Sequence, residues 1–398
     1  MIREIIARQN IFPLYYTTTL LVFIGSFLIL PTSKMVNNVY YVLIALPTFI
    51  SFLTKEGRRL DITAEICIWA MLFISFSLAG FRSGHDQYIR HILYVSLFVY
   101  AVSHHVLPDF FRSSIYKRSQ FWVLTFYSAG TSIAYWVSGK YAVGERIIFL
   151  ENRLNGPIST SMLIAACYAL AIPSWVREKR YLEMSIATAI SIFVISYCLQ
   201  SRSGLVGFVL IFALTPIYFF FQKDNIEKLK FMLLPWACIL CIFLASILLI
   251  PEIALLFKRG DSLRFQIWAA TIADWQECGL LLGCGAGFKS QHVIAGLGEI
   301  RHPHNIFLAL GVYNGLISLS IFIVLMSVTL YRAWRNHDSW GLYLAVALFC
   351  LCFDGSKLIT NPDELWLLIF LPAALIVNRR APLPIPQSKY VQIPEQSI

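Results

Sequence analysis

The chain has 398 residues, of which 58% are hydrophobic and only 14% are charged. An ordinary soluble domain is about one quarter charged, so this composition excludes a soluble globular enzyme. The formal net charge of +10 would suit a nucleic-acid-binding protein only if the basic residues were gathered on one segment, and they lie instead in short clusters between apolar stretches.

Apolar stretches of about twenty residues recur along the chain, and each can cross a hydrocarbon core of about 30 Å as a helix. Because lipid offers no water to an open backbone, we predict an all-α, polytopic membrane protein. About twelve spans are expected, near 11–30, 37–54, 62–81, 91–107, 119–137, 157–175, 181–199, 203–221, 230–250, 304–331, 338–355 and 364–378. They form one transmembrane domain, 1–380, followed by a short tail, 381–398. The first span is expected to be retained rather than cleaved as a signal peptide.

The loops between these spans alternate in charge. Every loop and tail on one side carries basic residues, namely Arg3, Arg8, Lys55, Arg58, Arg59, Arg112, Lys117, Arg118, Arg177, Lys179, Arg180, Lys223, Lys228, Lys230, Arg332, Arg335, Arg379, Arg380 and Lys389. By the positive-inside rule this side is cytoplasmic, and both termini lie on it. Because translocating an arginine opposes this bias, arginines kept on the outer side are candidates for function.

The outer loop 251–303 is the only long connection between predicted spans, and long ordered loops tend to be functional. Apolar residues at helical spacing predict an amphipathic helix over 261–275 at the membrane surface, with Asp261 or Ser262 as its N-cap. The segment L-G-C-G-A-G-F at 282–288 does not match the dinucleotide-binding fingerprint, so a tight backbone turn is expected there. Cys278 and Cys284 lie nearby in the same outer loop, where they could form a disulfide.

The strongest candidate for chemistry is R-H-P-H-N at 301–305, where the long loop enters the tenth predicted span. It places His302, His304 and Asn305 at the boundary between membrane and water. A neutral histidine there could take a proton from a hydroxyl near neutral pH. The alternative is that both histidines only hydrogen-bond to lipid headgroups or loop carbonyls.

Charged residues near the same surface are further candidates. Arg202, in the short turn Q-S-R-S-G, has a permanent charge and a shape suited to phosphate, although it could instead snorkel to lipid phosphate. Arg153 precedes the sixth span, and Arg264 lies in the amphipathic helix. Asp354 could orient a histidine, pair with an arginine or end a solvated helix. Asp and Glu residues form no cluster of Mg²⁺-ligand character, so no metal is expected.

Together these residues resemble the O-antigen ligases, of the wider O-antigen ligase, O-antigen polymerase and O-oligosaccharyltransferase group. In that family a His-(Asn/Ser/Gln) pair is followed by nine residues and then Gly-x-x-(Gly/Thr/Tyr). Here His304-Asn305 is followed by 306–314 and then Gly315, whereas Ser318 departs from the usual last residue. The family also has a histidine two positions before the motif and an arginine in each of two outer loops, matched by His302, Arg202 and Arg264.

The resemblance implies an all-α, GT-C-like glycosyltransferase on the periplasmic face of a Gram-negative inner membrane. The donor would be an O-antigen glycan on undecaprenyl diphosphate, and the acceptor a sugar hydroxyl of lipid A-core. Transfer would invert the anomeric configuration and need no metal or cofactor. The protein would contact membrane lipids and no nucleic acid. The proton acceptor would be His304 or His302, and the spacing of the motif favours His304. The diphosphate would be bound by Arg202, Arg264 and Arg153. Asn305, Gly315 and Asp354 would have supporting roles.

Two alternatives stay open. An O-antigen polymerase would use the same kind of donor but join it to another lipid-linked glycan, and the His-Asn pair favours the ligase. A transporter or lipid flippase commonly has ionisable residues near the middle of the bilayer. In this chain such residues gather at loops and span ends, with Glu65 as the main exception.

Overall fold

The computed structural model describes residues 11–52, 64–84, 86–220, 263–294, 298–300 and 302–378, with scattered positions between 236 and 254, and most of them are helical. The helices are α2 (Ile11–Ile29), α3 (Ser33–Tyr40), η1 (Tyr41–Ala45), α4 (Leu46–Ser51), α5 (Ala64–Arg82), α6 (Asp86–His104), α7 (Pro108–Arg112), α8 (Ser114–Val137), α9 (Pro157–Arg177), α10 (Tyr181–Phe193), η2 (Val194–Cys198), α11 (Arg202–Phe220), α14 (Arg264–Cys278), α15 (Ile306–Arg335), α16 (Trp340–Cys350), η4 (Trp366–Phe370) and α17 (Leu371–Val377).

Six of the described helical stretches are long and apolar enough to cross a membrane: α2, α5, α9, α10 with η2, α11 and α15. This confirms the prediction of an all-α membrane protein. Other predicted spans coincide with helices that are shorter, interrupted or less apolar, such as α16 and η4 with α17, so the number twelve stays a prediction. Most of the predicted span 230–250 and the tail 381–398 lie outside the described residues, and the division into one domain and a tail is untested.

Helix α9 forms the centre of one part of the bundle. Its side chains are buried without a break from Thr160 to Val176, as expected of a helix that is apolar on all sides and surrounded by others. Helices α8, α10, α11 and α16 pack against it. At the start of α11, a Cβ on Gly204 would lie 2.7 Å from the Cβ of Ser161, so the glycine allows a close approach to α9. The first residue of α11, Arg202, is thereby placed next to this core.

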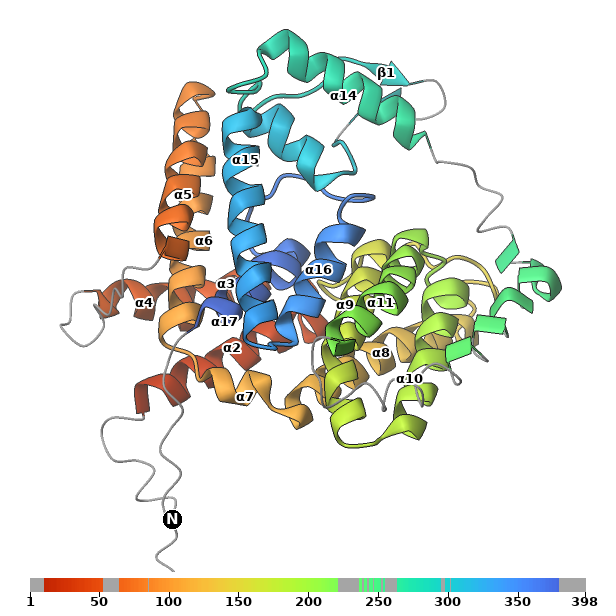
Figure 1. Ribbon diagram of the computed structural model, residues 1–398. Helices are drawn as coiled ribbons and strands as arrows, with labels where there is room; N and C mark the ends of the chain where they lie inside the picture. Colours follow the sequence, from red (N-terminus) through yellow and green to blue (C-terminus); the bar gives the residue numbers. More distant parts are fainter. Residues whose placement is uncertain are drawn as a thin grey trace, which may run out of the picture.

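Helix α15 changes direction at Gly315. The φ and ψ angles of this residue are 82° and 173°, which a residue with a Cβ rarely adopts. A Cβ there would also overlap the carbonyl group of Leu281 in the long loop. In Figure 1 the first part of α15 runs obliquely beneath α14, and the second part runs through the bundle. The predicted continuous span 304–331 is therefore two helical segments.

The long loop is hydrogen-bonded to α15 at this break. The amide of Leu316 donates to the carbonyl of Leu280 at 2.9 Å, and the amide of Cys284 donates to the carbonyl of Val312 at 2.6 Å. Residues 280–284 thus hydrogen-bond to backbone amide and carbonyl groups of α15 that lose their helical partners at the change of direction. The loop is held on the part of α15 that begins the candidate site.

Helix α14 lies within the long loop, across one end of the bundle (Figure 1). It begins after Leu263, which has a φ of 62° and provides no side-chain capping bond. The predicted caps, Asp261 and Ser262, lie outside the described residues. Cys278 and Cys284 form a disulfide just after the helix. Strands β1 (Val293–Ile294) and β2 (Gly298–Glu299) then form a small antiparallel hairpin, which the all-helical prediction did not include.

Candidate functional site

His304 and Asp354 form a hydrogen-bonded pair where the long loop meets the segment after α16. The Nδ1 atom of His304 lies 2.8 Å from Oδ1 of Asp354, and their side chains are 32% and 19% exposed. When Nδ1 donates its proton to the carboxylate, Nε2 is the nitrogen that can accept one. Among the three roles left open for Asp354, the geometry is that of a carboxylate that orients a histidine.

The backbone brings these two side chains together. Asn305 is the N-cap of α15, and its Oδ1 accepts hydrogen bonds from the amides of Phe307 and Leu308 at 2.9 and 3.1 Å. The amide just before these, that of Ile306, donates to the carbonyl of Leu351, just after α16, at 3.0 Å. The start of α15 therefore abuts the end of α16, which places Asp354 near the positive end of the α15 dipole.

His302 lies beside this pair. The ring centroids of His302 and His304 are 4.1 Å apart. Between them, the carbonyl of Pro303 accepts a hydrogen bond from the indole of Trp268 on α14 at 3.1 Å. Helix α14 thus holds the segment that carries both histidines, and His304 itself has a φ of 52°, a left-handed conformation that is uncommon for a residue with a Cβ.

The same three side chains offer a possible set of metal ligands. One ligand atom each from His302, His304 and Asp354 lies within 4.8 Å of the others. Two imidazoles and a carboxylate are a donor set that zinc or iron uses in proteins. The sequence argument against a metal considered only clusters of Asp and Glu, and it did not bring Asp354 to the histidines. The arrangement can therefore act as a proton acceptor or hold a metal.

Arg202 lies at the same end of the bundle as the His304–Asp354 pair. Cys350 ends α16, four positions before Asp354. Its Sγ donates a hydrogen bond to the carbonyl of Ser203, the second residue of α11, at 3.4 Å. The turn before α11 is also held to α9, by a 2.6 Å hydrogen bond from the hydroxyl of Ser161 to that of Ser201. As the first residue of α11, Arg202 adds its charge to a helix N-terminus, which favours an anion.

Arg264 is the first residue of α14, one helical turn before Trp268. Residues four apart lie on the same face of a helix, so Arg264 shares a face with the residue that contacts Pro303. The side chain is partly exposed. The role predicted for Arg264 stays a prediction.

Arg153 is engaged elsewhere. Its guanidinium forms a 2.7 Å ion pair with Glu364, and the two side chains are only 14% and 17% exposed. The neighbouring Asp363 is partly exposed, and desolvation together with the charge of Glu364 raises its pKa to about 7. The acidic pair just before the last predicted span was visible in the sequence, but nothing there linked it to Arg153. The ion pair favours a structural role for Arg153 over the predicted one at a diphosphate.

Two other basic residues hold the glycine-rich loop. Arg82 donates to the carbonyl of Gly283 at 2.9 Å, and Lys357 donates to the carbonyl of Ala286 at 2.6 Å. The ammonium of Lys357 also lies 4.7 Å from the ring centroid of Tyr313, and burial lowers its pKa. The predicted tight turn at 282–288 is thus fixed by charged side chains from α5 and from the segment after α16.

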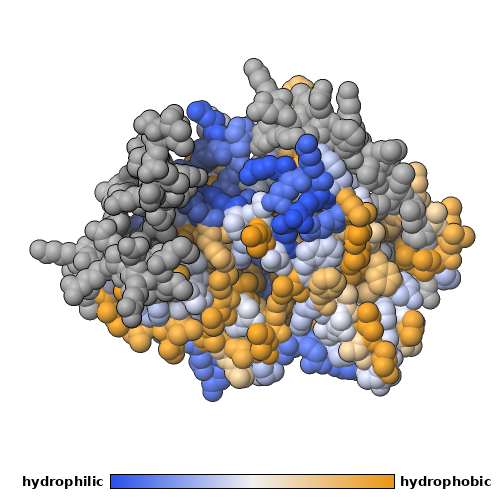
Figure 2. Space-filling model, turned by 90° about the horizontal axis from the view of Figure 1, so that it is seen from below, coloured by the Kyte–Doolittle hydropathy of each residue, from blue (hydrophilic) through white to orange (hydrophobic). Residues whose placement is uncertain are grey.

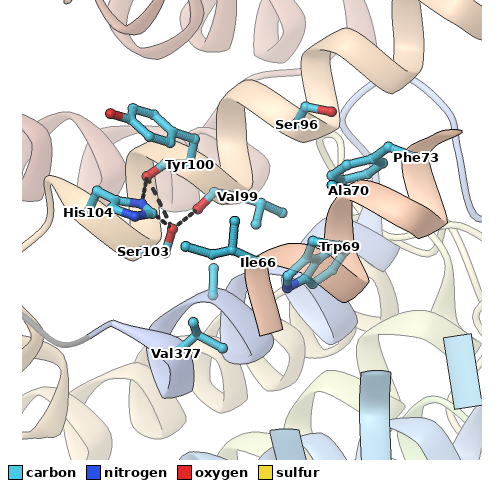
Figure 3. Close-up of a pocket in the computed structure, with 11 residues that line it drawn as sticks. Ile66, Trp69, Ala70, Phe73, Ser96, Val99, Tyr100, Ser103, His104 and Val377 are labelled. Carbon is cyan, nitrogen blue, oxygen red and sulfur yellow. Dashed lines mark hydrogen bonds between the residues drawn. The ribbon is translucent and has the colours of Figure 1, made fainter. Parts of the chain in front are cut away.

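A separate apolar cavity of about 150 Å³ lies between α5, α6 and α17 (Figure 3). Trp69, Phe73 and Tyr100 are among its lining residues, and His104 is hydrogen-bonded there to Ser103 at 2.8 Å. It is lined by the first half of α5 and the second half of α6, whereas the long loop contacts the opposite end of α5. The cavity is therefore distinct from the histidine site.

Comparison with known proteins adds one relative. The chain is 21% identical over 355 residues to an O-antigen ligase of Pseudomonas aeruginosa, an alignment that covers 85% of this chain and 84% of the relative. No family model matches the chain, and no solved structure matches it. The apolar helices of this chain and its similarity to this relative together indicate a multi-pass, all-α membrane protein that is similar to an O-antigen ligase.

Proposed function

We propose that the protein is a glycosyltransferase of lipopolysaccharide biosynthesis, an O-antigen ligase that transfers a glycan from undecaprenyl diphosphate to a sugar hydroxyl of lipid A-core. The observation that carries the proposal is the 2.8 Å pair of His304 and Asp354 at the same end of the bundle as Arg202. The similarity to the Pseudomonas aeruginosa ligase along most of the chain supports it.

In this proposal His304 is the general base. Its Nε2 takes the proton of the acceptor hydroxyl while Asp354 keeps Nδ1 protonated and stabilises the imidazolium that forms. The acceptor oxygen bonds to the anomeric carbon as the bond from that carbon to the diphosphate oxygen breaks, so the configuration inverts. Undecaprenyl diphosphate leaves with the bonding electron pair. His302, beside His304, would position the base or the acceptor.

Arg202 and Arg264 would bind the diphosphate of the donor. Charge develops on the leaving oxygen as the glycosidic bond breaks, and fixed cations at that position lower the barrier. The assignment of Arg202 is supported by its position at the N-terminus of α11, which itself favours an anion. The assignment of Arg264 is supported by its position one helical turn before Trp268. Arg153, with its ion pair to Glu364, is assigned to holding the outer loop before α9.

The proposed setting is the bacterial inner membrane, with the histidine site on the periplasmic face and both termini in the cytoplasm. The support is the distribution of basic residues, which are concentrated in the loops and tails of one side. The donor and the acceptor are both membrane-anchored, so a site at the membrane boundary can be reached by both. Glu65, the main exception that favoured a transporter, forms a 2.8 Å ion pair with Arg332 at the other end of α15.

The test is reconstitution of the purified protein with undecaprenyl-diphosphate-linked glycan and lipid A-core, without nucleotide. Wild type is compared with His304→Ala, Arg202→Ala and, as a control from the same long loop, His292→Ala, which removes a histidine paired with Asp274. We expect glycan on lipid A-core with wild type and the control, and its loss in the other two variants. Addition of a chelator separates the two uses of the histidine site, because only a metal-dependent reaction would stop.

Two other outcomes would change the assignment. If the glycan only lengthens on its own lipid carrier, the protein is a polymerase. If no glycan is transferred to any acceptor, transport of a lipid-linked substrate becomes the better proposal, and flipping of a labelled lipid in vesicles would test it.

A further inference from the structure

A polar cavity lies at the other end of α15 from the histidine site. The twenty residues that follow Gly315 span about 30 Å, so the two sites are separate. The cavity has a volume of about 510 Å³ and is bounded by the α7–α8 junction, the end of α9 and the turn between α15 and α16. Its lining comprises Arg112, Lys117, Arg177, Arg332, Asn336, His337, Asp338, Ser339, Ile376 and Asn378. Figure 2, viewed from below, shows hydrophilic residues gathered in the middle of this face.

The acidic groups at this cavity are already paired. Asp338 forms a 2.9 Å ion pair with Arg112 and accepts a hydrogen bond from the amide of Trp340. Glu65 pairs with Arg332 at 2.8 Å. Lys117 and Arg177 have no ion pair or side-chain hydrogen bond to any residue that the structure describes. The cavity therefore has an excess of positive charge.

Lys117 occupies an unfavourable position for a cation. It is only 6% exposed and lies in the first turn of α8, at the positive end of the helix dipole, ahead of the predicted span 119–137. Burial lowers the pKa of its amino group to about 8; nearby Asp338 opposes this, and Arg177 and Arg112 add to it. A buried cation without a partner is costly, so a ligand of opposite charge would be bound favourably.

A buried hydroxyl completes the group. Ser339 is 2% exposed, its Oγ has no hydrogen-bond partner among the described residues, and it does not cap α16 although it stands at the N-cap position. An ammonium, a guanidinium and a hydroxyl at one cavity are suited to the oxygens of a phosphate group. We propose that this cavity binds a phosphate-bearing anion through Lys117, Arg177 and Ser339, at a site distinct from the one proposed for glycosyl transfer.

The phosphate could belong to a lipid headgroup or to a soluble anion, and binding to the full-length protein distinguishes them. In a neutral detergent, the affinity for inorganic phosphate and for pyrophosphate is measured by calorimetry. In a second arm, native mass spectrometry measures retention of phosphatidylglycerol relative to phosphatidylcholine. Lys117→Met, Arg177→Gln and Ser339→Ala are compared with Lys140→Met, a control at an ion-paired lysine in the loop between α8 and α9.

We expect binding in one arm, weakened about tenfold or more by Lys117→Met and less by Ser339→Ala, with the control unchanged. Binding of only phosphatidylglycerol would assign the site to a lipid headgroup, and binding of phosphate or pyrophosphate would assign it to a soluble anion. The proposal is overturned if no anion binds in either arm, or if the variants bind as wild type does. Should Lys117→Met fail to fold, Arg177→Gln, at an exposed position, decides the test in the same way.

Discussion

The Nδ1 atom of His304 lies 2.8 Å from Oδ1 of Asp354, although the two residues are 50 positions apart in the sequence. Both sides of the contact are held by the backbone. The amide of Ile306 donates to the carbonyl of Leu351, and a Cβ on Gly355 would come within 2.8 Å of that amide nitrogen. The carboxylate is thus presented to the histidine by two segments in close contact.

Asp354→Asn tests whether this contact serves catalysis. The amide cannot stabilise an imidazolium and can favour the wrong tautomer, so we expect kcat for glycan transfer to fall about 100-fold or more. KM should change little, and the unfolding temperature should stay close to that of wild type because the substitution keeps the shape of the side chain. Equal kcat values for the variant and wild type would assign Asp354 to a structural role. Steady-state kinetics as a function of pH provides the readout.

Arg153 and Arg202 are expected to differ when each is changed to glutamine. Arg153→Gln leaves Glu364, whose side chain is only 17% exposed, without its partner, so it should destabilise the protein by about 2 kcal/mol. Arg202→Gln should leave stability nearly unchanged and lower kcat/KM for the donor. Thermal unfolding and kinetics of both variants separate these effects. A stable Arg153→Gln protein with weakened donor use would restore the diphosphate role to Arg153.

Local patterns predicted much of this molecule. Apolar length identified helices such as α9 and α11, and helical spacing placed a helix within the long loop that is close to α14. The two histidines were singled out because they lie two positions apart at the end of a predicted span. These features depend on residues within a few turns of one another, which is the range over which hydropathy and spacing are informative.

Contacts between distant segments could not be predicted in this way. Nothing near Asp354 in the sequence indicates that it pairs with His304, and nothing near Arg153 indicates Glu364. The turn at Gly315 was also missed, because an apolar stretch does not show that the long loop occupies the space of a missing Cβ. Lys117 was explained by the positive-inside rule, which assigns a side of the membrane and says nothing of burial.

Gly315→Ala tests the change of direction in α15. The backbone at this position has a φ of 82°, and the new Cβ would overlap the carbonyl of Leu281, so the variant should lose about 2 kcal/mol or more of stability. Activity should fall with it, since the break directs the start of α15 toward Asp354. Gly25→Ala, in the second half of α2, is the matched control, because a Cβ there meets no atom within 4 Å. Equal unfolding temperatures for both variants would contradict the proposed importance of the break.

The pH dependence of stability tests the burial of Lys117. Its pKa is about 8 in the folded protein and 10.5 for an ordinary lysine, so between these values the unfolded chain binds more protons. The free energy of unfolding should therefore rise with pH across this window, and the cost of the buried ammonium is fully present below pH 8. It amounts to about 3 kcal/mol at 1.36 kcal/mol per pKa unit.

Lys117→Met removes that cost. Without phosphate, the variant should be more stable than wild type at pH 7, and the difference should shrink as the pH approaches 10.5. The charged groups that act on Lys117 are Asp338, Arg177 and Arg112. Unfolding temperatures of both proteins from pH 7 to 10, in the same detergent, give the comparison. A constant difference over this range would show that Lys117 does not titrate there. Added phosphate at pH 7 should stabilise wild type alone, because a bound anion balances the ammonium that the variant lacks.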